Sequence, residues 1–215
     1  MSPSPKPTTS SYAVAGLLAL RPWTAYDLTK QMARSLRFIW PRSERHGYDE
    51  PKRLVALGWA KAKHKTSGGR TVAEYRVTAD GRRALREWLA TRPAPPVLEC
   101  EVMLRLIHAD HGTKDQLVAS LQSTREDIAS MLPDLLRQVE EYATDGGPFP
   151  ERLHVIALYT DFYARFLALL DEWSEDAIEE VERWQSTTDV GLTPRGQEIF
   201  AEVFDRFGHP TEAKQ

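Results

Sequence analysis

The sequence predicts a mainly α-helical protein that carries one small β-hairpin and is divided into two parts. Over most of its 215 residues, apolar side chains recur three or four positions apart, as they do on one face of a helix. Between residues 59 and 77 apolar and polar residues alternate instead, which is typical of strands. The stretch that contains Pro93, Pro95 and Pro96 interrupts the helical pattern, so we expect a linker over residues 93–97.

The two sides of this linker differ in charge. Residues 1–92 hold 18 Lys and Arg against 7 Asp and Glu, a net charge of +11, whereas residues 93–215 hold 10 against 24, a net charge of −14. The total of −3 is therefore a cancellation. Since charge asymmetry of this kind often marks a part that binds nucleic acid, we expect the basic part to bind a polyanion and the acidic part to lie away from it.

Two short helices are predicted at the start of the basic part. Residues 1–11 are rich in Ser, Pro and Thr, and we expect them to be disordered. Residues 12–20 form a largely apolar run that ends before Pro22, which predicts a short buried helix. Thr24 is placed to cap a second helix, which should end near Trp40 because the residue after it is a proline.

A third helix is predicted over residues 44–57. Ser43 is placed to cap its start, and Gly58 suits its C-terminal end. Pro51 lies inside this range, where it removes one backbone donor and costs about 3 kcal/mol unless a kink is accommodated. The prediction of this helix therefore depends on such a kink.

A hairpin and a fourth helix complete the basic part, which spans residues 12–92. Lys61, Lys63 and Lys65 take every second position, a Gly-Gly turn follows, and the alternation resumes up to Val77, which predicts a hairpin with a basic outer face. Thr78 is placed to cap the next helix. Three helices followed by a two-stranded wing are a winged helix-turn-helix, in which the third helix enters the major groove and the hairpin tip reaches the flanking backbone.

These segments resemble PadR-family transcriptional regulators. The matching segments cover residues 12–20, 26–30, 40–43, 48–58 and 75–88. The sequence departs from the family pattern at Thr24-Ala25, where the family often has His-Gly, and at Gly47, where a leucine is common. In PadR-like proteins with a long C-terminal region, the C-terminal helices form the dimer interface and can host an effector response. The resemblance therefore implies a ligand-responsive homodimeric transcriptional repressor.

Candidate DNA-binding residues lie near the start of the third helix and on the wing. Arg45 is suited to reading a guanine edge, and the others to holding phosphates. A homodimer would present two recognition helices to a pseudo-palindromic operator in double-stranded DNA, one or more duplex turns apart. The candidates are Arg42, Ser43, Arg45, His46, Tyr48 and Lys52 on the third helix, and Lys65 and Arg70 on the wing.

The acidic part, residues 98–215, is predicted to be helical and to pair subunits. Helices are expected over residues 99–108, 113–144 and 150–185, followed by a short docking helix within residues 192–207, and Pro133 should bend the second. The helix expected over residues 150–185 carries an apolar stripe that is too long for one surface helix, so we expect a second subunit to pack against it. The stripe consists of Ile156, Tyr159, Tyr163, Phe166, Leu170, Trp173, Ala177, Val181 and Trp184.

An aromatic effector has candidate contacts within this stripe. Aromatic side chains stack on planar small molecules, although the same residues also suit a plain interface core. Neither reading is excluded by the sequence. The candidate effector-binding residues are Tyr159, Tyr163, Phe166 and Trp173.

No motif for catalysis, nucleotide binding or metal binding is present. The sequence lacks G-x-G-x-x-G, a P-loop, H-E-x-x-H and G-x-S-x-G, so we expect neither an enzyme nor a cofactor. His108 and His111 are spaced like metal ligands, but most such pairs bind nothing, and Cys100 reads as a small buried side chain. We therefore expect no metal site.

Two other classes of protein remain as alternatives. One is a winged-helix protein-interaction module without direct DNA binding, and the other is an enzyme whose winged domain only dimerises. The second needs alternating strands and a glycine loop that the acidic part lacks. No apolar run approaches the roughly 18 residues of a membrane-spanning helix, and the N-terminus has no signal core, so we expect a cytoplasmic protein without a membrane partner.

Overall fold

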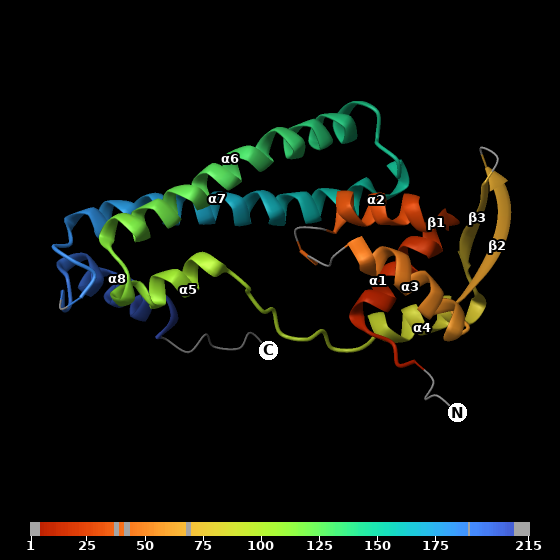
Figure 1. Ribbon diagram of the computed structural model, residues 1–215, viewed down its shortest axis with the longest axis horizontal. Coiled ribbons are helices and arrows are strands. Elements are labelled where there is room, and N and C mark those ends of the chain that lie inside the picture. Colours follow the sequence, from red (N-terminus) through yellow and green to blue (C-terminus); the bar gives the residue numbers. More distant parts are fainter. Residues whose placement is uncertain (1–4, 37–38, 41–43, 68–69, 189, 209–215) are drawn as a thin grey trace. The chain divides into compact units, whose positions relative to one another are not determined.

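The chain folds into two compact units, Met1–Pro96 and Val97–Gln215. The computed structural model describes residues 5–36, 39–40, 44–67, 70–188 and 190–208 (Figure 1). Both units are mainly helical, and the sheet belongs to the first. The predicted fold class, mainly α with a small β-hairpin wing, is confirmed.

The first unit has the predicted order of three helices, a hairpin and a fourth helix. A short strand that the sequence did not predict, β1, pairs antiparallel with β3, so the sheet order is β1-β3-β2. The elements are α1 (Thr9–Leu20), β1 (Trp23–Thr24), α2 (Ala25–Ser35), α3 (Glu44–Ala56), β2 (Ala60–Ser67), β3 (Arg70–Val77) and α4 (Ala79–Leu89).

The core of this first unit, the winged-helix unit, lies between the three helices and one face of the sheet. Leu18 of α1, Leu28 of α2 and Leu54 of α3 are at most 2% exposed. Trp23 of β1 is buried too, and its indole Nε1 donates a hydrogen bond of 2.9 Å to the carbonyl oxygen of Leu17. Since helices and strands all contribute to one core, the position of α3 is fixed from several sides.

The N-terminal helix begins earlier than the sequence predicted. Thr8 accepts a hydrogen bond from the backbone N–H of Ser11, and the side chain of Ser11 accepts one from the backbone of Thr8 in return, which is a capping box. Ser11 also donates a hydrogen bond of 2.9 Å to the buried carboxylate of Glu50 on α3. The expectation of disorder over residues 1–11 is therefore wrong for residues 9–11.

The third helix forms through its internal proline, as the sequence predicted. Pro51 is almost completely buried inside α3. Gly58 follows the helix with a φ of +74°, a left-handed conformation that favours glycine. The helix before it, α2, is capped by Thr24 as predicted but ends at Ser35, short of the expected end near Trp40.

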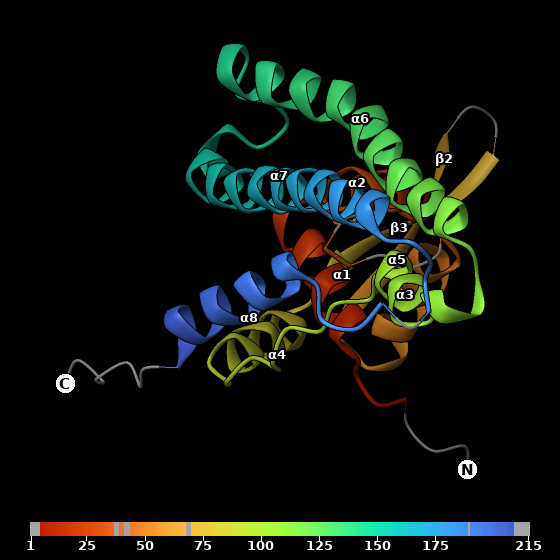
Figure 2. The same cartoon turned by 90° about the vertical axis from the view of Figure 1, so that its left-hand side faces the viewer.

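The second unit, the helical unit, is built around two long helices that lie side by side (Figures 1 and 2). Arg125 of α6 links them with ion pairs of 2.9 Å to Asp171 and 3.0 Å to Glu175 of α7. Thr113 caps α6, which continues through Pro133 as one helix. The elements are α5 (Glu101–Ile107), η1 (Ala109–His111), α6 (Lys114–Thr144), η2 (Pro150–Arg152), α7 (Leu153–Arg183) and α8 (Pro194–Phe207).

One helix of this unit corrects an expectation about membranes. Pro150–Arg183 contains an 18-residue window with a mean hydropathy of 1.3, so it is long and apolar enough to cross a membrane. Only 11% of this window is buried. This is weak evidence for a membrane span, because helices that pack on protein partners reach the same values.

Candidate nucleic-acid interface

The structure describes the side chains of three of the eight candidate DNA-binding residues. Arg42 and Ser43 lie outside the described residues. The backbones of Arg45 and His46 are in α3, and that of Arg70 begins β3, but their side chains are not described. Tyr48, Lys52 and Lys65 are all exposed.

Tyr48 and Lys52 are four residues apart and share one face of α3. The Tyr48 side chain is 43% exposed, and Lys52 forms only a loose ion pair of 3.7 Å with the exposed carboxylate of Asp49. Glu50 and Leu54 are buried against the rest of the unit. The helix therefore keeps one face for the core and offers another to solvent, as a recognition helix requires.

Gly47 explains one departure from the PadR pattern. A Cβ atom at this position would lie 2.3 Å from Oγ1 and 3.3 Å from Cα of Thr29 on α2. A contact with backbone at that distance leaves little room to adjust, so a leucine here would push α2 and α3 apart. Glycine thus permits the close approach of the two helices that form the helix-turn-helix.

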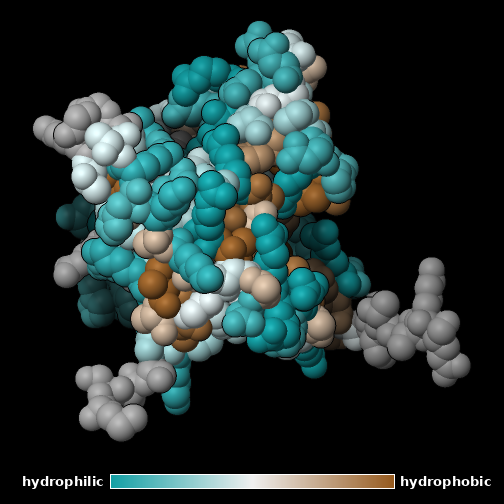
Figure 3. Space-filling view, turned by 90° about the vertical axis from the view of Figure 1, so that its right-hand side faces the viewer, coloured by the Kyte–Doolittle hydropathy of each residue, from teal (hydrophilic) through white to brown (hydrophobic). Residues whose placement is uncertain are grey.

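The sheet has one apolar and one basic face. Ala60, Trp23 and Tyr75, each at most 6% exposed, point to the core. The Cα register pairs Lys61 with Arg76 and Lys63 with Glu74 on the outer face. Figure 3 views the molecule from the side on which the hairpin lies and shows a largely hydrophilic surface there. The predicted basic outer face of the hairpin is therefore present.

Glu74 is the one described carboxylate on this outer sheet face. Lys65 donates a hydrogen bond of 2.5 Å to its Oε1 atom, and Arg76 lies 3.4 Å from its Oε2 atom. The hydrogen bond from Lys65, with a smaller contribution from Arg76, lowers the pKa of Glu74 below its ordinary value. The carboxylate is thus held charged and offsets part of the positive charge around it. The sequence-based set of candidate DNA-binding residues includes Lys65 but not Lys61, Lys63 and Arg76, which are exposed on the same sheet face.

The candidate effector residues are not all brought together. The rings of Tyr159 and Tyr163 are stacked with centroids 6.5 Å apart, and the Tyr163 hydroxyl lies 3.6 Å from the Met131 sulfur on α6. Phe166 follows on the same face of α7 and is partly buried. Trp173 packs instead on the cluster formed by α5, α6 and the end of α7, ten residues and about 15 Å further along the helix.

The predicted apolar stripe is covered largely within the chain. Val181 is 2% exposed in a cluster with Val102 of α5 and Leu121 of α6, and Tyr163 is 4% exposed. Seven of its nine residues still keep part of their surface exposed in the single chain, and the expectation that a second subunit covers the stripe stays a prediction. The exposed apolar residues of α7 form a different row, which consists of Val155, Leu158, Phe162 and Leu169.

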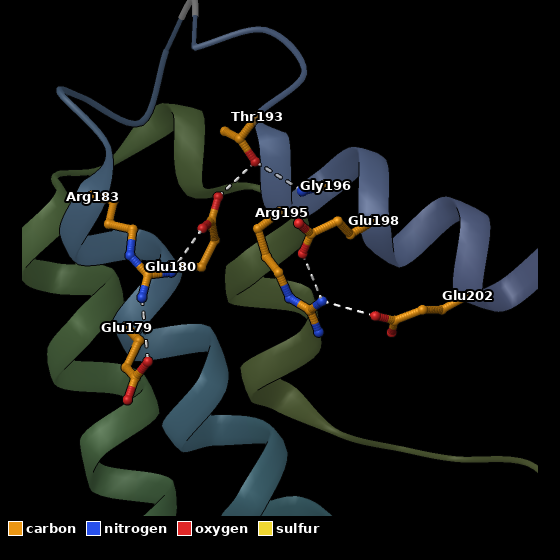
Figure 4. Close-up of polar contacts among 8 residues, drawn as sticks. All are labelled: Glu179, Glu180, Arg183, Thr193, Arg195, Gly196, Glu198 and Glu202. Atoms are coloured by element: carbon orange, nitrogen blue, oxygen red, sulfur yellow. Dashed lines mark hydrogen bonds and ion pairs between the residues drawn. The ribbon is translucent and has the colours of Figure 1, made fainter.

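The start of α8 is linked to the end of α7 by a hydrogen bond to the carboxylate of Glu180 (Figure 4). Glu180 accepts hydrogen bonds of 2.6 Å from the Thr193 hydroxyl and 3.0 Å from the indole Nε1 of Trp184, and Arg183 lies 3.4 Å away. These donors, Thr193 first, lower the pKa of Glu180. Thr193 also caps α8 by accepting from the backbone N–H of Gly196 at 3.0 Å.

Beyond this attachment, α8 exposes an apolar face. The predicted short docking helix is confirmed as a helix, and its apolar side chains are 40% to 72% exposed. They are Ile199, Phe200, Val203, Phe204 and Phe207.

The described part of the chain contains no group of three or more His, Cys, Asp or Glu residues that is placed to hold a metal ion. His111 lies 3.8 Å from Asp110 at the surface, and Cys100 is partly buried with a free thiol.

The chain is similar to PadR-like regulators in sequence and in fold. No family model matches it. It is 22% identical over 176 residues to the negative transcriptional regulator PadR of Bacillus subtilis (strain 168). The aligned region covers 75% of this chain and 97% of that protein. The resemblance predicted from the sequence is thereby supported by a curated relative.

Solved structures of such proteins superpose on most of the chain. Bacillus subtilis PadR in complex with operator DNA matches with a TM-score of 0.69 at 20% identity, covering 81% of this chain and 99% of that one. The PadR-like regulator BC1756 from Bacillus cereus matches with 0.67 at 18%, covering 81% and 98%. Bacillus subtilis PadR in complex with p-coumaric acid matches with 0.57 at 18%, covering 83% and 99%. These likenesses confirm the predicted fold.

Proposed function

We propose that this PadR-like chain is a DNA-binding transcriptional regulator, a homodimeric repressor whose hold on its operator responds to a small aromatic ligand. The observation that carries the proposal is the winged-helix unit, which exposes Tyr48 and Lys52 on α3 beside a sheet with a basic outer face. The curated relative is named a negative transcriptional regulator, and a neighbour of the same fold was solved with operator DNA.

DNA binding is assigned to residues 12–92, with α3 in the major groove and the wing on the flanking backbone. Arg45 reads a guanine edge, which is worth about 1–3 kcal/mol of discrimination. The other contacts hold phosphates and set the register without reading sequence. They are Arg42, Ser43, His46, Tyr48, Lys52, Lys65 and Arg70.

Dimerisation is assigned to residues 98–215, which the linker 93–97 joins to the DNA-binding domain. The row of α7 that contains Leu158 and Phe162, respectively 75% and 62% exposed, is apolar surface that a second copy would bury. Two copies related by a two-fold axis present two α3 helices to the two halves of a pseudo-palindromic operator.

The effector response is assigned to the aromatic cluster of Tyr159, Tyr163 and Phe166. The stacked tyrosines lie between α6 and α7, where a planar ligand that enters would change how these helices pack. One neighbour of the same fold was solved with p-coumaric acid, a phenolic acid. The ligand would thereby shift the spacing of the two recognition helices.

A regulatory rather than an enzymatic role, and a cytoplasmic location, follow from this proposal. The rival function is a protein-interaction module that binds no DNA. The two differ in salt dependence, because each phosphate contact on duplex DNA contributes about −0.9 to the slope of log affinity against log salt.

The proposal is tested by titrating the protein against the duplex that flanks its own coding region, with and without p-coumaric acid. We expect salt-dependent binding that the acid weakens. Replacing Arg45 and Arg70 together by Ala should weaken binding at moderate salt tenfold or more with the fold intact, whereas Arg165→Ala in the helical unit should not. Absence of salt-dependent duplex affinity would instead favour the interaction module.

A further inference from the structure

The first turn of α1 contains two buried serines, and each bonds to a distant part of the winged-helix unit. Ser10 is 7% exposed and Ser11 is 0% exposed. The Ser11 hydroxyl donates a hydrogen bond of 2.9 Å to the Oε2 atom of Glu50 on α3. The Ser10 hydroxyl accepts a hydrogen bond of 3.1 Å from the indole Nε1 of Trp40. One helical turn therefore holds two residues that lie 39 and 30 positions away in the sequence.

Glu50 is a buried carboxylate that complements the start of α1. It is 4% exposed, and Arg53, also on α3, lies 3.4 Å from its Oε1 atom. The residues that form the first turn of α1 include no acidic one. Because a helix N-terminus favours a nearby negative charge and a buried carboxylate needs hydrogen bonds, the contact with Ser11 stabilises both groups. Glu50 thereby ties the middle of α3 to the start of α1.

The two anchored residues lie on either side of the segment proposed to read DNA. Five of the eight candidate contacts, from Arg42 to Tyr48, fall between Trp40 and Glu50 in the chain. A bidentate contact with a base edge depends closely on distance and angle, whereas attraction to phosphates falls off slowly with distance. A small displacement of α3 would therefore weaken base reading more than it weakens phosphate binding.

We propose that Ser10, Ser11 and Glu50 are positioning residues, through which the start of α1 sets the place of α3 on the operator. The inference rests on the proposed function and adds to it residues that need not touch DNA. Losing their hydrogen bonds should reduce the preference for the operator over other duplexes. Affinity for those other duplexes should remain, since it comes from phosphate contacts.

The test measures the ratio of two affinities, for the duplex that flanks the coding region and for a scrambled duplex of the same length and composition. Ser11→Ala should lower this ratio at least tenfold. Ser10→Ala, which keeps the contact with Glu50, should lower it several-fold. Affinity for the scrambled duplex and its salt dependence should not change in either variant, because phosphate contacts tolerate a small displacement.

Exchanges at Glu50 separate its hydrogen bond from the volume of its side chain. Glu50→Gln keeps an acceptor oxygen for Ser11 and should retain most of the ratio. Glu50→Met removes both acceptors and should lower the ratio as Ser11→Ala does. The double variant Ser11→Ala with Glu50→Met should be no worse than either single variant, since both changes remove one interaction.

Trp23→Phe is the control for a general loss of stability in the same unit. It removes the hydrogen bond of 2.9 Å from the indole to the Leu17 carbonyl, which links β1 to a later turn of α1. Its melting temperature should fall while its ratio stays that of the wild type. Circular dichroism and the melting temperature of every variant show that the titrations use folded protein.

The outcomes separate this inference from the proposed function. Wild-type protein that binds both duplexes equally, or neither of them, overturns the proposed function itself. If the wild type prefers the flanking duplex and both Ser→Ala variants keep that preference, the inference alone is overturned. Loss of the preference to the same extent in Trp23→Phe overturns it too, because the serines would then only stabilise the unit. If Ser11→Ala does not fold, Ser10→Ala decides.

Discussion

The two units of the chain use their apolar residues differently. The winged-helix unit buries Val14, Leu28 and Leu54 completely and presents charge on the outer face of its sheet. The helical unit has the longer helices, yet it leaves Phe162 62% exposed on α7 and Phe204 67% exposed on α8. The winged-helix unit packs a core of its own and presents a charged surface to solvent. The other has an apolar surface that a second copy would complete.

The largest expected effect on stability comes from replacing a fully buried leucine in the core of each unit by alanine. Leu54 in α3 and Leu121 in α6 are both 0% exposed, and replacing either by Ala should cost about 2–5 kcal/mol. We expect Leu54→Ala to destabilise the winged-helix unit and DNA binding while the dimer persists. Leu121→Ala should destabilise the helical unit instead.

Urea unfolding, followed together with sedimentation, checks this prediction. Leu54→Met and Leu121→Met, which conserve volume, should cost less than about 1.5 kcal/mol and serve as controls. If both Ala variants shift one common unfolding transition by the same amount, the two units do not unfold separately. The idea that each unit is stabilised by its own core would then be wrong.

The second prediction concerns the exposed row of α7. Phe162→Glu places a charge on a surface that the dimer should bury, and the dimer dissociation constant should rise at least tenfold, or by about 1.4 kcal/mol. Analytical ultracentrifugation over a range of concentrations measures it. Phe162→Leu keeps the surface apolar and should change the dimer little. An unchanged dimer in Phe162→Glu would mean that this row is not the interface, and Phe204→Glu would then test α8.

The winged-helix unit could be predicted from sequence because its signals are local. The alternation of Lys61, Lys63 and Lys65 defines the hairpin, and Thr78 before Ala79 defines the start of α4. What the sequence missed there depends on distant partners. Strand β1 has only two residues and exists because Trp23 pairs with Tyr75, and the early start of α1 is supported by the contact of Ser11 with Glu50, 39 residues away.

In the helical unit the helices were predictable but their faces were not. The period of 3.6 identifies α7 as a helix, yet both the row of Tyr163 and the row of Phe162 are apolar, and periodicity does not tell which one α6 covers. For the same reason, the sequence could not show which of the candidate aromatic residues lie together. Trp173 shares the stripe with Tyr163 but packs on a different cluster, since a stripe on a long helix passes several neighbours.

A smaller effect is expected from the carboxylate on the basic face. Lys65 holds Glu74 in its charged form. Glu74→Gln therefore removes one negative charge from the sheet face, which raises the net charge of that face by one, and it also removes the ion-pair partner of Lys65 and Arg76. Affinity for duplex DNA should rise by about two- to fivefold at low salt, and the gain should shrink as salt screens the charges. Fluorescence anisotropy at two salt concentrations measures it, with Glu87→Gln on α4 as the control. A loss of affinity would show that Glu74 positions Lys65 productively.

The smallest expected effect concerns the attachment of α8 to the end of α7 through Glu180. Glu180 has a pKa below its ordinary 4.5 because Thr193, Trp184 and Arg183 stabilise its charged form. Its contribution to holding α8 is therefore complete above its unfolded pKa and is lost as the pH falls through the lowered folded value. At neutral pH, Glu180→Gln should speed amide exchange at the start of α8 a few-fold, and the difference from wild type should vanish in acid. Glu179→Gln removes only a surface pair with Arg183 and should exchange as wild type does. Equal exchange in Glu180→Gln and wild type at neutral pH would show that the Thr193 cap alone holds this end, and that the attachment of α8 does not depend on charge.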